Sequence, residues 1–220
     1  MGDHDAVVVL SGGMDSTTLL YRYAKRGGRV HAVSFDYGQR HRRELEYAEK
    51  TCQKLGVLWK MFDLSGIKDA VAGSALTGGG PVPHGHYADE TMKATVVPNR
   101  NMLMLSIAMA YAITVDAGVV AYAAHAGDHA IYPDCRPEFV EAMKRVALLV
   151  DFKPRVIDAP YILMTKADIA REGAVLGVDY SMTWSCYEGG DVHCARCGTC
   201  VERREAFALA GVVDPTRYQA

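Results

Sequence analysis

Two glycines, a carboxylate and four hydroxyl groups occupy one short stretch near the start of the 220-residue chain. Glycines can adopt a positive φ and leave no side chain between the backbone and a ligand. Backbone N–H groups at a helix start, together with the helix dipole, favour a bound phosphate. Since a carboxylate here would repel a bare phosphate, a Mg²⁺ ion is expected between the two. We therefore predict an anion site formed by Leu10, Ser11, Gly12, Gly13, Met14, Asp15, Ser16, Thr17, Thr18, Leu19 and Leu20.

A strand and a helix are expected to hold this stretch in place. Residues 6–10 form an apolar run typical of a buried strand, and an apolar stripe resumes at helical spacing from Met14. Two familiar phosphate loops do not fit, because no Lys follows Gly13 and the three spaced glycines of a dinucleotide site are absent. The functionless alternative is an ordinary glycine-rich turn before a helix.

Four of the six cysteines lie within fifteen residues, at Cys186, Cys194, Cys197 and Cys200. Four thiolates satisfy tetrahedral Zn²⁺, and an all-cysteine site is closed and structural. Disulfides are disfavoured in a reducing compartment. An iron–sulfur cluster is the serious rival, but its usual run continues with a further Cys-Pro that is absent here. His193, beside the cluster, is expected to point away from the metal.

The remaining pattern predicts a doubly wound, mainly parallel α/β sheet, because strands and helices alternate at regular spacing. Ligands of such sheets bind beyond the carboxyl ends of the strands. The apolar helix expected over 102–115 is predicted to be buried on nearly all sides, with its methionines in the core. The expected strands are 6–10, 30–35, 57–64, 118–124 and 156–160, and the other helices are 39–55, 137–150 and 166–176.

Composition limits the possible partners. Half of the residues are hydrophobic and the formal charge is −2, which gives no electrostatic reason to expect a nucleic-acid partner. The sequence has no membrane span and no signal peptide, so a cytoplasmic protein with reduced cysteines is expected.

We predict an α/β domain over 1–180, with a flexible insert at about 67–94, and a metal-binding segment over 181–220. The insert is either a lid or a loop without function, and its His84 and His86 are weak metal candidates.

Five motifs occur in one order and identify a resemblance. The glycine-rich stretch alone resembles the pyrophosphate loop (PP-loop) of the N-type ATP pyrophosphatases. The whole set resembles the 7-cyano-7-deazaguanine synthase family over about residues 6 to 207. The motifs are 11–16, Phe35 to His41, Pro98 to Asn101, Tyr132 to Arg136, and the cysteine cluster.

The resemblance implies an adenine nucleotide alpha hydrolase-like fold and a homodimer. It also implies an ATP-dependent ligase that converts 7-carboxy-7-deazaguanine and ammonia into the nitrile through adenylated carboxylate and amide intermediates. Relatives that stop at the amide, or that transfer the activated deazaguanine to another acceptor, are the alternatives. A zinc-bearing tRNA-binding module with a vestigial ATP fold would require a basic face, and the near-neutral charge argues against it.

Site roles follow from the resemblance, position by position. The stretch from Leu10 to Leu20 would hold ATP, with Asp15 placing Mg²⁺. Lys166 and Arg100 are candidates for phosphate contacts, and Asp36 or Tyr37 for the adenine pocket. For the deazaguanine the candidates are Asp128, Asp134 and Arg136, although the histidine-rich segment 124–131 departs from the usual pattern. Cys135 is interpreted as a packed thiol of the pocket wall.

Overall fold

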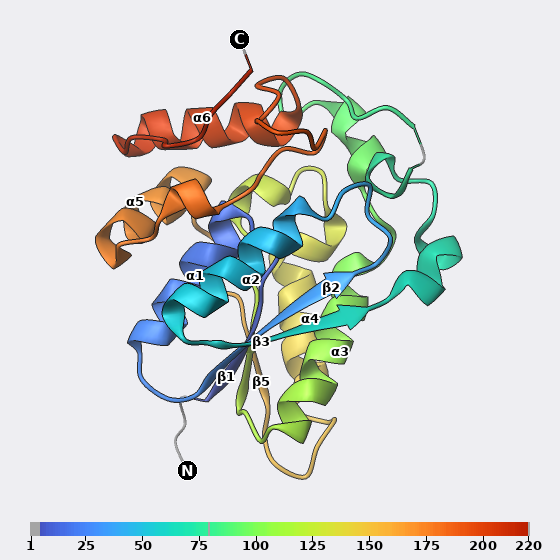
Figure 1. The fold of residues 1–220 in the computed structure, drawn as a ribbon. Coiled ribbons are helices and arrows are strands. Elements are labelled where there is room, and N and C mark those ends of the chain that lie inside the picture. Colours follow the sequence, from blue (N-terminus) through green and yellow to red (C-terminus); the bar gives the residue numbers. More distant parts are fainter. Residues whose placement is uncertain (1–4, 79, 220) are drawn as a thin grey trace.

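The computed structural model describes residues 5–78 and 80–219, and a five-stranded parallel sheet lies at its centre (Figure 1). The strand order is β3-β2-β1-β4-β5, so the chain winds in one direction from β1 and then in the other. The reversal between β1 and β4 is where doubly wound sheets bind ligands. The strands are β1 (Ala6–Val9), β2 (Val30–Asp36), β3 (Leu58–Asp63), β4 (Val119–Ala121) and β5 (Val156–Asp158).

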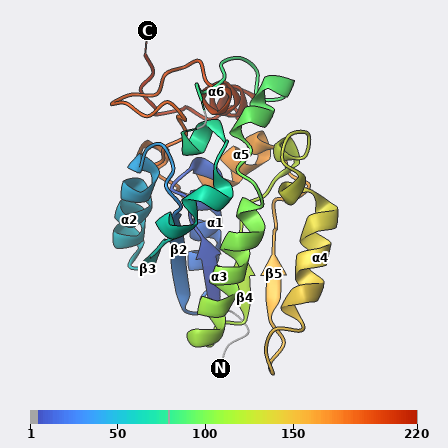
Figure 2. The ribbon, with the colours of Figure 1, turned by 90° about the vertical axis from the view of Figure 1, so that its right-hand side faces the viewer.

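Helices cover both faces of the sheet (Figure 2). On one face lie α1 (Met14–Lys25), α2 (Arg43–Leu55) and α5 (Lys166–Leu176), and on the other lie α3 (Arg100–Thr114) and α4 (Pro137–Ala147). Successive residues of a strand point to opposite faces. Val7 therefore packs with Leu105 of α3, while Val8 packs with Leu19 of α1. The predicted doubly wound α/β fold is confirmed.

A sixth helix, α6 (Gly198–Ala210), packs on α5 beyond the carboxyl edge of the sheet (Figure 1). Its buried Arg203 donates to the carboxylate of Asp214, to the hydroxyl of Thr183 and to the carbonyl of Tyr180. These bonds draw the last part of the chain back onto the domain. A buried guanidinium with several acceptors satisfies its donors without water, so this helix is firmly placed above the sheet edge.

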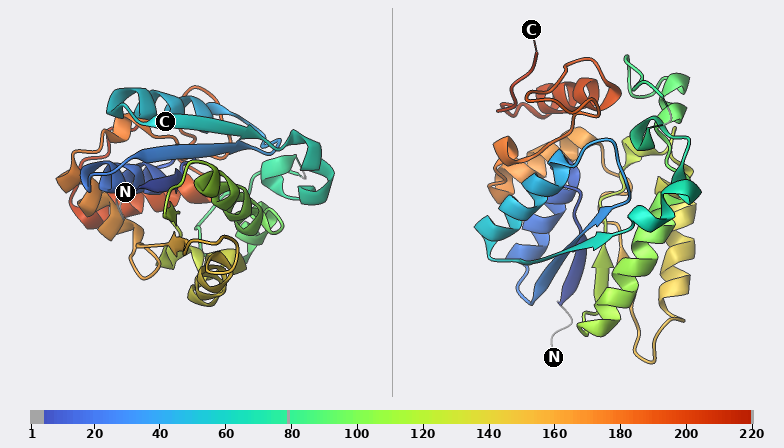
Figure 3. Two further views of the ribbon diagram at one scale, coloured as in Figure 1. Left: turned by 90° about the horizontal axis from the view of Figure 1, so that it is seen from below. Right: turned by 45° about the vertical axis from the view of Figure 1, so that its right-hand side comes forward.

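Residues 65–95 form three short 3₁₀ helices, η1 (Ser65–Val71), η2 (Ala75–Thr77) and η3 (Glu90–Thr95). They surround a small buried cluster that includes Val71 and Leu76. Figure 3 shows this segment at one side of the domain, reaching up to α6. There the amide of Gly85 donates to the carbonyl of Arg196 at 3.1 Å. His84 and His86 pair separately with Glu188 and Glu205.

Three expectations need correction. The helix predicted from residue 39 begins at Arg43, because the Gln39 side chain bonds the backbone of Tyr37 and Phe35 and holds a turn there. The 102–115 helix is not buried all round: Met102 is 46% exposed, and only one face of α3 packs on the sheet. The strand predicted over 118–124 pairs only over Val119–Ala121.

Of the helices that the structure describes, none combines the length and apolar character needed to cross a bilayer.

The turn between β1 and α1 lies against the backbone of α2. Gly12 has φ +91°, and a Cβ atom at this position would lie 2.0 Å from the carbonyl oxygen of Glu44. Gly27 has a similar φ of +78° but no atom within 4 Å of its Cβ position. Both positions thus have a positive φ that favours glycine, but only at Gly12 would a side chain also clash with a neighbouring backbone.

We predict that Gly12→Ala destabilises the fold by at least about 3 kcal/mol, whereas Gly27→Ala costs about 1 kcal/mol. The difference arises because only at position 12 must the backbone of α2 move. Urea denaturation of both variants and the wild type measures it. Equal losses for the two variants would show that the close approach has no energetic weight.

Candidate functional site

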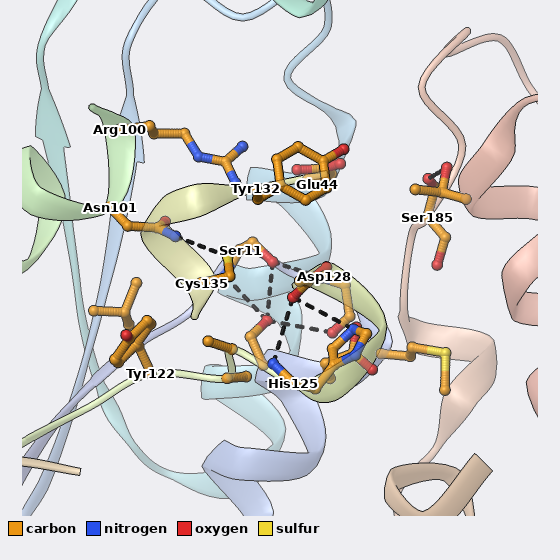
Figure 4. Close-up of a pocket in the computed structure, with 18 of the residues that line it drawn as sticks. Ser11, Glu44, Arg100, Asn101, Tyr122, His125, Asp128, Tyr132, Cys135 and Ser185 are labelled. Carbon is orange, nitrogen blue, oxygen red and sulfur yellow. Dashed lines mark hydrogen bonds and ion pairs between the residues drawn. The ribbon is translucent and has the colours of Figure 1, made fainter. Parts of the chain in front are cut away.

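A cavity of about 250 Å³ opens at the carboxyl edge of the sheet, at the reversal between β1 and β4 (Figure 4). Its walls come from the β1–α1 turn, α2, the starts of α3, α5 and α6, and the loop after β4. Parts of the chain far apart in sequence therefore meet around one space. Its polar wall includes Ser11, Glu44, Arg100, His125, Asp128, Lys166 and Glu202.

The glycine-rich turn forms the floor of this cavity. The Ser11 hydroxyl accepts from the amide of Gly13 at 3.2 Å, and the Ser16 hydroxyl accepts from the amide of Ser11 at 3.1 Å. From the other side, the amide of Trp184 donates to the carbonyl of Gly12 at 3.0 Å. The first amides of α1 have no acceptor within their own helix. The start of α1 therefore presents amides without intrahelical partners and oriented hydroxyl groups, an arrangement that would suit an anion.

Lys166, the first residue of α5, lies between two carboxylates. Its Nζ atom is 2.5 Å from Oε2 of Glu202 on α6 and 3.4 Å from Oδ2 of Asp15 on α1. Burial alone would lower the pKa of Lys166, but the charges of Asp15 and Glu202 outweigh it and raise that pKa well above its usual range. The ammonium group therefore stays charged and is held at the floor of the cavity.

His125 lies between two carboxylates in the same region. Its Nδ1 accepts from the amide of Gly127 at 3.1 Å, which leaves Nε2 to carry the proton of the neutral ring. Nε2 lies 3.5 Å from Oδ2 of Asp128 and 3.8 Å from Oδ2 of Asp15. The imidazole is almost fully buried. It thus holds the two carboxylates beside each other, as Figure 4 shows for Asp128.

The donors of this cluster fit a hard divalent cation. Asp15, Asp128 and Glu202 bring three negative charges against the one positive charge of Lys166. In addition, Oδ1 of Asp15 is buried and has no hydrogen-bond partner among the residues that the structure describes. Carboxylate oxygens together with phosphate oxygens are the usual ligands of Mg²⁺. Asp15 and Asp128 are the residues that would hold the ion.

The other end of the cavity carries a second pair of charges among tyrosines. Glu44 of α2 and Arg100 of α3 line it together with Tyr37, Tyr132 and Tyr187. Burial raises the pKa of Glu44 to about 7, and the charge of Arg100 opposes that rise. Nearby, burial also raises the pKa of the Cys135 thiol. The sulfur of Cys135 accepts a hydrogen bond from the side-chain Nδ2 of Asn101 at 3.1 Å. This supports the interpretation of Cys135 as a packed thiol.

The structure separates the predicted site residues into two groups. Ten of them line the cavity: Leu10, Ser11, Gly13, Met14, Asp15, Ser16, Tyr37, Arg100, Asp128 and Lys166. The rest of the glycine-rich stretch supports it from behind, through residues 12 and 17–20, which are buried.

Three predicted residues lie outside the lining. The carboxylate of Asp36 pairs with Arg42 at 2.8 Å, and that of Asp134 accepts from the amide of Asn101 at 3.0 Å. Arg136 is exposed and donates to the carbonyl of His129. Asp134 instead fixes the start of α3, and with it Arg100. Sequence reasoning missed Glu44 and Glu202, because each appears only as one charge among others on a helix.

The four cysteines form a buried cluster next to the cavity. Their sulfur atoms all lie within 4.8 Å of one another, and no disulfide joins them. Tetrahedral zinc with bonds of about 2.3 Å would place its sulfurs about 3.8 Å apart. Backbone amides donate to the sulfurs, for example Cys194 N to Cys186 Sγ at 3.3 Å. His193 packs on Trp184, accepts from the amide of Ser185 and is not part of the group of four sulfurs. The cluster is able to hold a metal ion.

Solved structures share the fold. A 4-thiouridine synthetase in complex with RNA and bound ATP matches with a TM-score of 0.53 and 16% identity, over 94% of this chain and 50% of that one. The U34-tRNA thiolase NcsA from Methanococcus maripaludis, with its [4Fe-4S] cluster, matches with a TM-score of 0.50 and 18% identity, over 95% and 66%. At such low identities these likenesses concern the fold alone.

The structure defines a doubly wound α/β protein with a glycine-rich turn at the carboxyl edge of its sheet and a C-terminal cysteine cluster. A family model described as Queuosine biosynthesis protein QueC matches residues 5–211, and the chain belongs to this family. The 7-cyano-7-deazaguanine synthase of Caldicellulosiruptor saccharolyticus is 58% identical over 97% of this chain and 95% of its own length. That of Marinobacter nauticus is 55% identical over 97% and 96%. The chain is thus an enzyme of queuosine biosynthesis.

We predict that Glu44→Gln stabilises the free protein at pH 8. A carboxyl whose pKa rises on folding retains its proton longer in the folded state, so stability falls as the pH rises from about 4.5 to 7. Above pH 7 the variant avoids this cost, and we expect a gain of about 1–2 kcal/mol, or about 3–6 °C in Tm. The gain should be smaller at pH 5.

Thermal melting at the two pH values tests this, with the exposed Glu46→Gln on the same helix as the matched control. The groups that face Glu44 are Arg100, Tyr37 and Tyr187, and none of them titrates between pH 5 and 8. A gain that is the same at both pH values would mean that the carboxylate is not desolvated.

Proposed function

We propose that this enzyme is an ATP-dependent ligase that makes 7-cyano-7-deazaguanine from 7-carboxy-7-deazaguanine and ammonia, with release of AMP and pyrophosphate. The observation that carries the proposal is the Asp15–Lys166 pair at the start of α1, in a chain that belongs to the QueC family. A cation site and an ammonium group beside free helix amides form a suitable cradle for the β and γ phosphates of ATP.

The first step is adenylation of the substrate. A carboxylate is a poor electrophile, so its oxygen attacks the α phosphorus of ATP and pyrophosphate leaves, which gives an acyl-adenylate. In this step Lys166 neutralises charge that develops on the phosphates, while Asp15 and Asp128 would hold Mg²⁺. The ion, when bound, screens the phosphate oxygens from the attacking carboxylate. The protein thus acts mainly by positioning and by electrostatics.

Ammonia then attacks the acyl carbon, loses a proton and displaces AMP, which gives the amide. The amide oxygen attacks the α phosphorus of a second ATP, and pyrophosphate leaves again. Loss of AMP and of the two amide N–H protons leaves the nitrile. Of the three residues first considered for the deazaguanine, Asp128 alone lines the cavity, and it lies at the end that would hold the phosphates.

Two related reactions are the alternatives, namely arrest at the amide and transfer of the activated deazaguanine to another acceptor. The stoichiometry separates them from the main proposal. Nitrile formation consumes two ATP per product, whereas arrest at the amide consumes one. Mass spectrometry of the product distinguishes nitrile from amide by the loss of one water.

We further propose that the metal is a structural Zn²⁺ bound by Cys186, Cys194, Cys197 and Cys200, and that the chain divides into the α/β domain 1–180 and the segment 181–220. The all-cysteine donor set supports zinc in a closed site.

The free cysteines support a cytoplasmic location. Exposed apolar residues after α4, including Leu149 and Phe152, support a homodimer.

We predict that Cys197→Ser loses the bound zinc and lowers Tm by 10 °C or more, roughly, since metal binding contributes folding energy directly. The matched control is Cys52→Ser, which removes a buried thiol that belongs to a different part of the core from the cysteine cluster. It should keep the metal. Elemental analysis of the purified proteins is the measurement. Iron and sulfide in place of zinc, or a Cys197→Ser protein that keeps full zinc and Tm, would contradict the proposed site.

We predict that Asp15→Ala lowers AMP release from the acid, ammonium and Mg-ATP by at least about 10³-fold, because the cation loses its ligand. Tm should stay close to the wild-type value, since Lys166 retains Glu202 as its partner. The exposed Asp69→Ala serves as the control. Release of ADP and phosphate by the wild type would refute the α-phosphate mechanism. A large fall in Tm of Asp15→Ala would show a structural role.

A further inference from the structure

The tyrosine-lined end of the cavity holds a carboxylate and a guanidinium that are not in direct contact. Glu44 and Arg100 both line this end, yet no ion pair joins them among the residues that the structure describes. Nor does any described protein group hydrogen-bond the carboxylate of Glu44. Figure 4 shows both side chains at the end of the cavity opposite His125. Unpaired charges in a half-buried site are costly unless a ligand satisfies them.

The two charges define the chemistry of that ligand. A carboxylate accepts two parallel hydrogen bonds from adjacent N–H donors, and a guanidinium pairs with an anion or a carbonyl oxygen. Tyr37, Tyr132 and Tyr187 line this end, and aromatic side chains pack favourably against a planar aromatic ring system. The fitting ligand is therefore a planar heterocycle with a pair of N–H donors on one edge and an anion on another.

We propose that Glu44 and Arg100 form the subsite for the base, with Glu44 accepting from N1–H and the 2-amino group of the 7-deazaguanine and Arg100 pairing with its 7-carboxylate. This rests on the proposed function and adds the recognition of the base to it. Adenine cannot replace the base, because its N1 is an acceptor and would face the carboxylate of Glu44. The subsite therefore also keeps the two nucleobases of the reaction apart.

The backbone places this subsite at a fixed position relative to the phosphates. The carbonyl oxygen of Glu44 lies so close to Gly12 that a Cβ there would be 2.0 Å away. Arg100 is fixed in turn, because Asn101 bonds both the carboxylate of Asp134 and the sulfur of Cys135. A base held between these two residues would present its 7-carboxylate beside Arg100.

Calorimetric titration of the full-length protein at pH 8 tests the subsite with two probes. One is 7-carboxy-7-deazaguanine, and the other is 7-carboxy-7-deazaadenine, which has the carboxylate but not the donor pair. We expect the wild type to bind the guanine-type acid at least tenfold more tightly. Glu44→Gln should raise its Kd about 10–100-fold and remove the preference, since a charge-assisted pair of hydrogen bonds is lost.

Two controls make the result specific. Glu46 is exposed and lies two residues after Glu44 on the same helix. The Glu46→Gln variant should bind both acids as the wild type does. Mg-ATP should bind Glu44→Gln within about twofold of the wild type, which shows that the variant is folded and that its phosphate site is intact. Glu44→Asp, which keeps the charge, should retain the preference for the guanine-type acid.

The outcomes separate this inference from the proposed function. If the wild type makes the nitrile but Glu44→Gln retains the preference, the subsite is wrong and the function stands. The same holds if Glu44→Gln weakens Mg-ATP binding as much as acid binding. If the wild type neither binds nor converts the guanine-type acid, the proposed function fails and the subsite fails with it.

Discussion

The close approach of two backbones, at Gly12 and Glu44, is the constraint on which the candidate site depends. Because no side chain fits between them, the glycine-rich turn lies directly on α2. The amide of Trp184 bonds the same glycine from the C-terminal segment, residues 181–220. A turn held on two sides keeps its amides oriented before any ligand arrives. Such preorganisation is what electrostatic catalysis requires, since dipoles that are already aligned need no reorganisation during the reaction.

The C-terminal segment contributes chemistry as well as support. Glu202 lies two residues after Cys200 in the second turn of α6, and its carboxylate holds Lys166 in the cavity. The cysteine cluster fixes the start of that helix, while the buried Arg203 fixes its position relative to the end of the chain. A metal ion bound by the cysteines would therefore act on the site through the position of one ammonium group. Such coupling would explain why a cysteine cluster that is able to hold a metal ion lies next to the cavity.

The sequence predicts what is local and misses what the fold brings together. The glycine-rich turn, the sheet and the cysteine cluster follow from spacing over a few residues, and each is present in the structure. The roles of Glu44 and Glu202 depend on residues of other elements, such as Arg100 and Lys166, so helical periodicity alone identifies these glutamates only as surface charges. The segment 132–136 shows the opposite problem. Tyr132 and Cys135 line the cavity, but the 3₁₀ turn directs Asp134 and Arg136 elsewhere.

Under the proposed function, one cavity must adenylate two different oxygens in turn. A subsite that holds the base by its N1–H and 2-amino edge makes this possible, because that edge does not change between acid, amide and nitrile. Only the substituent at position 7 changes, and it stays beside Arg100 and the phosphate cradle throughout. The Arg100 guanidinium pairs well with a carboxylate and less well with a neutral amide or nitrile. The same arrangement that orients the substrate for the first step therefore favours release of the product after the last.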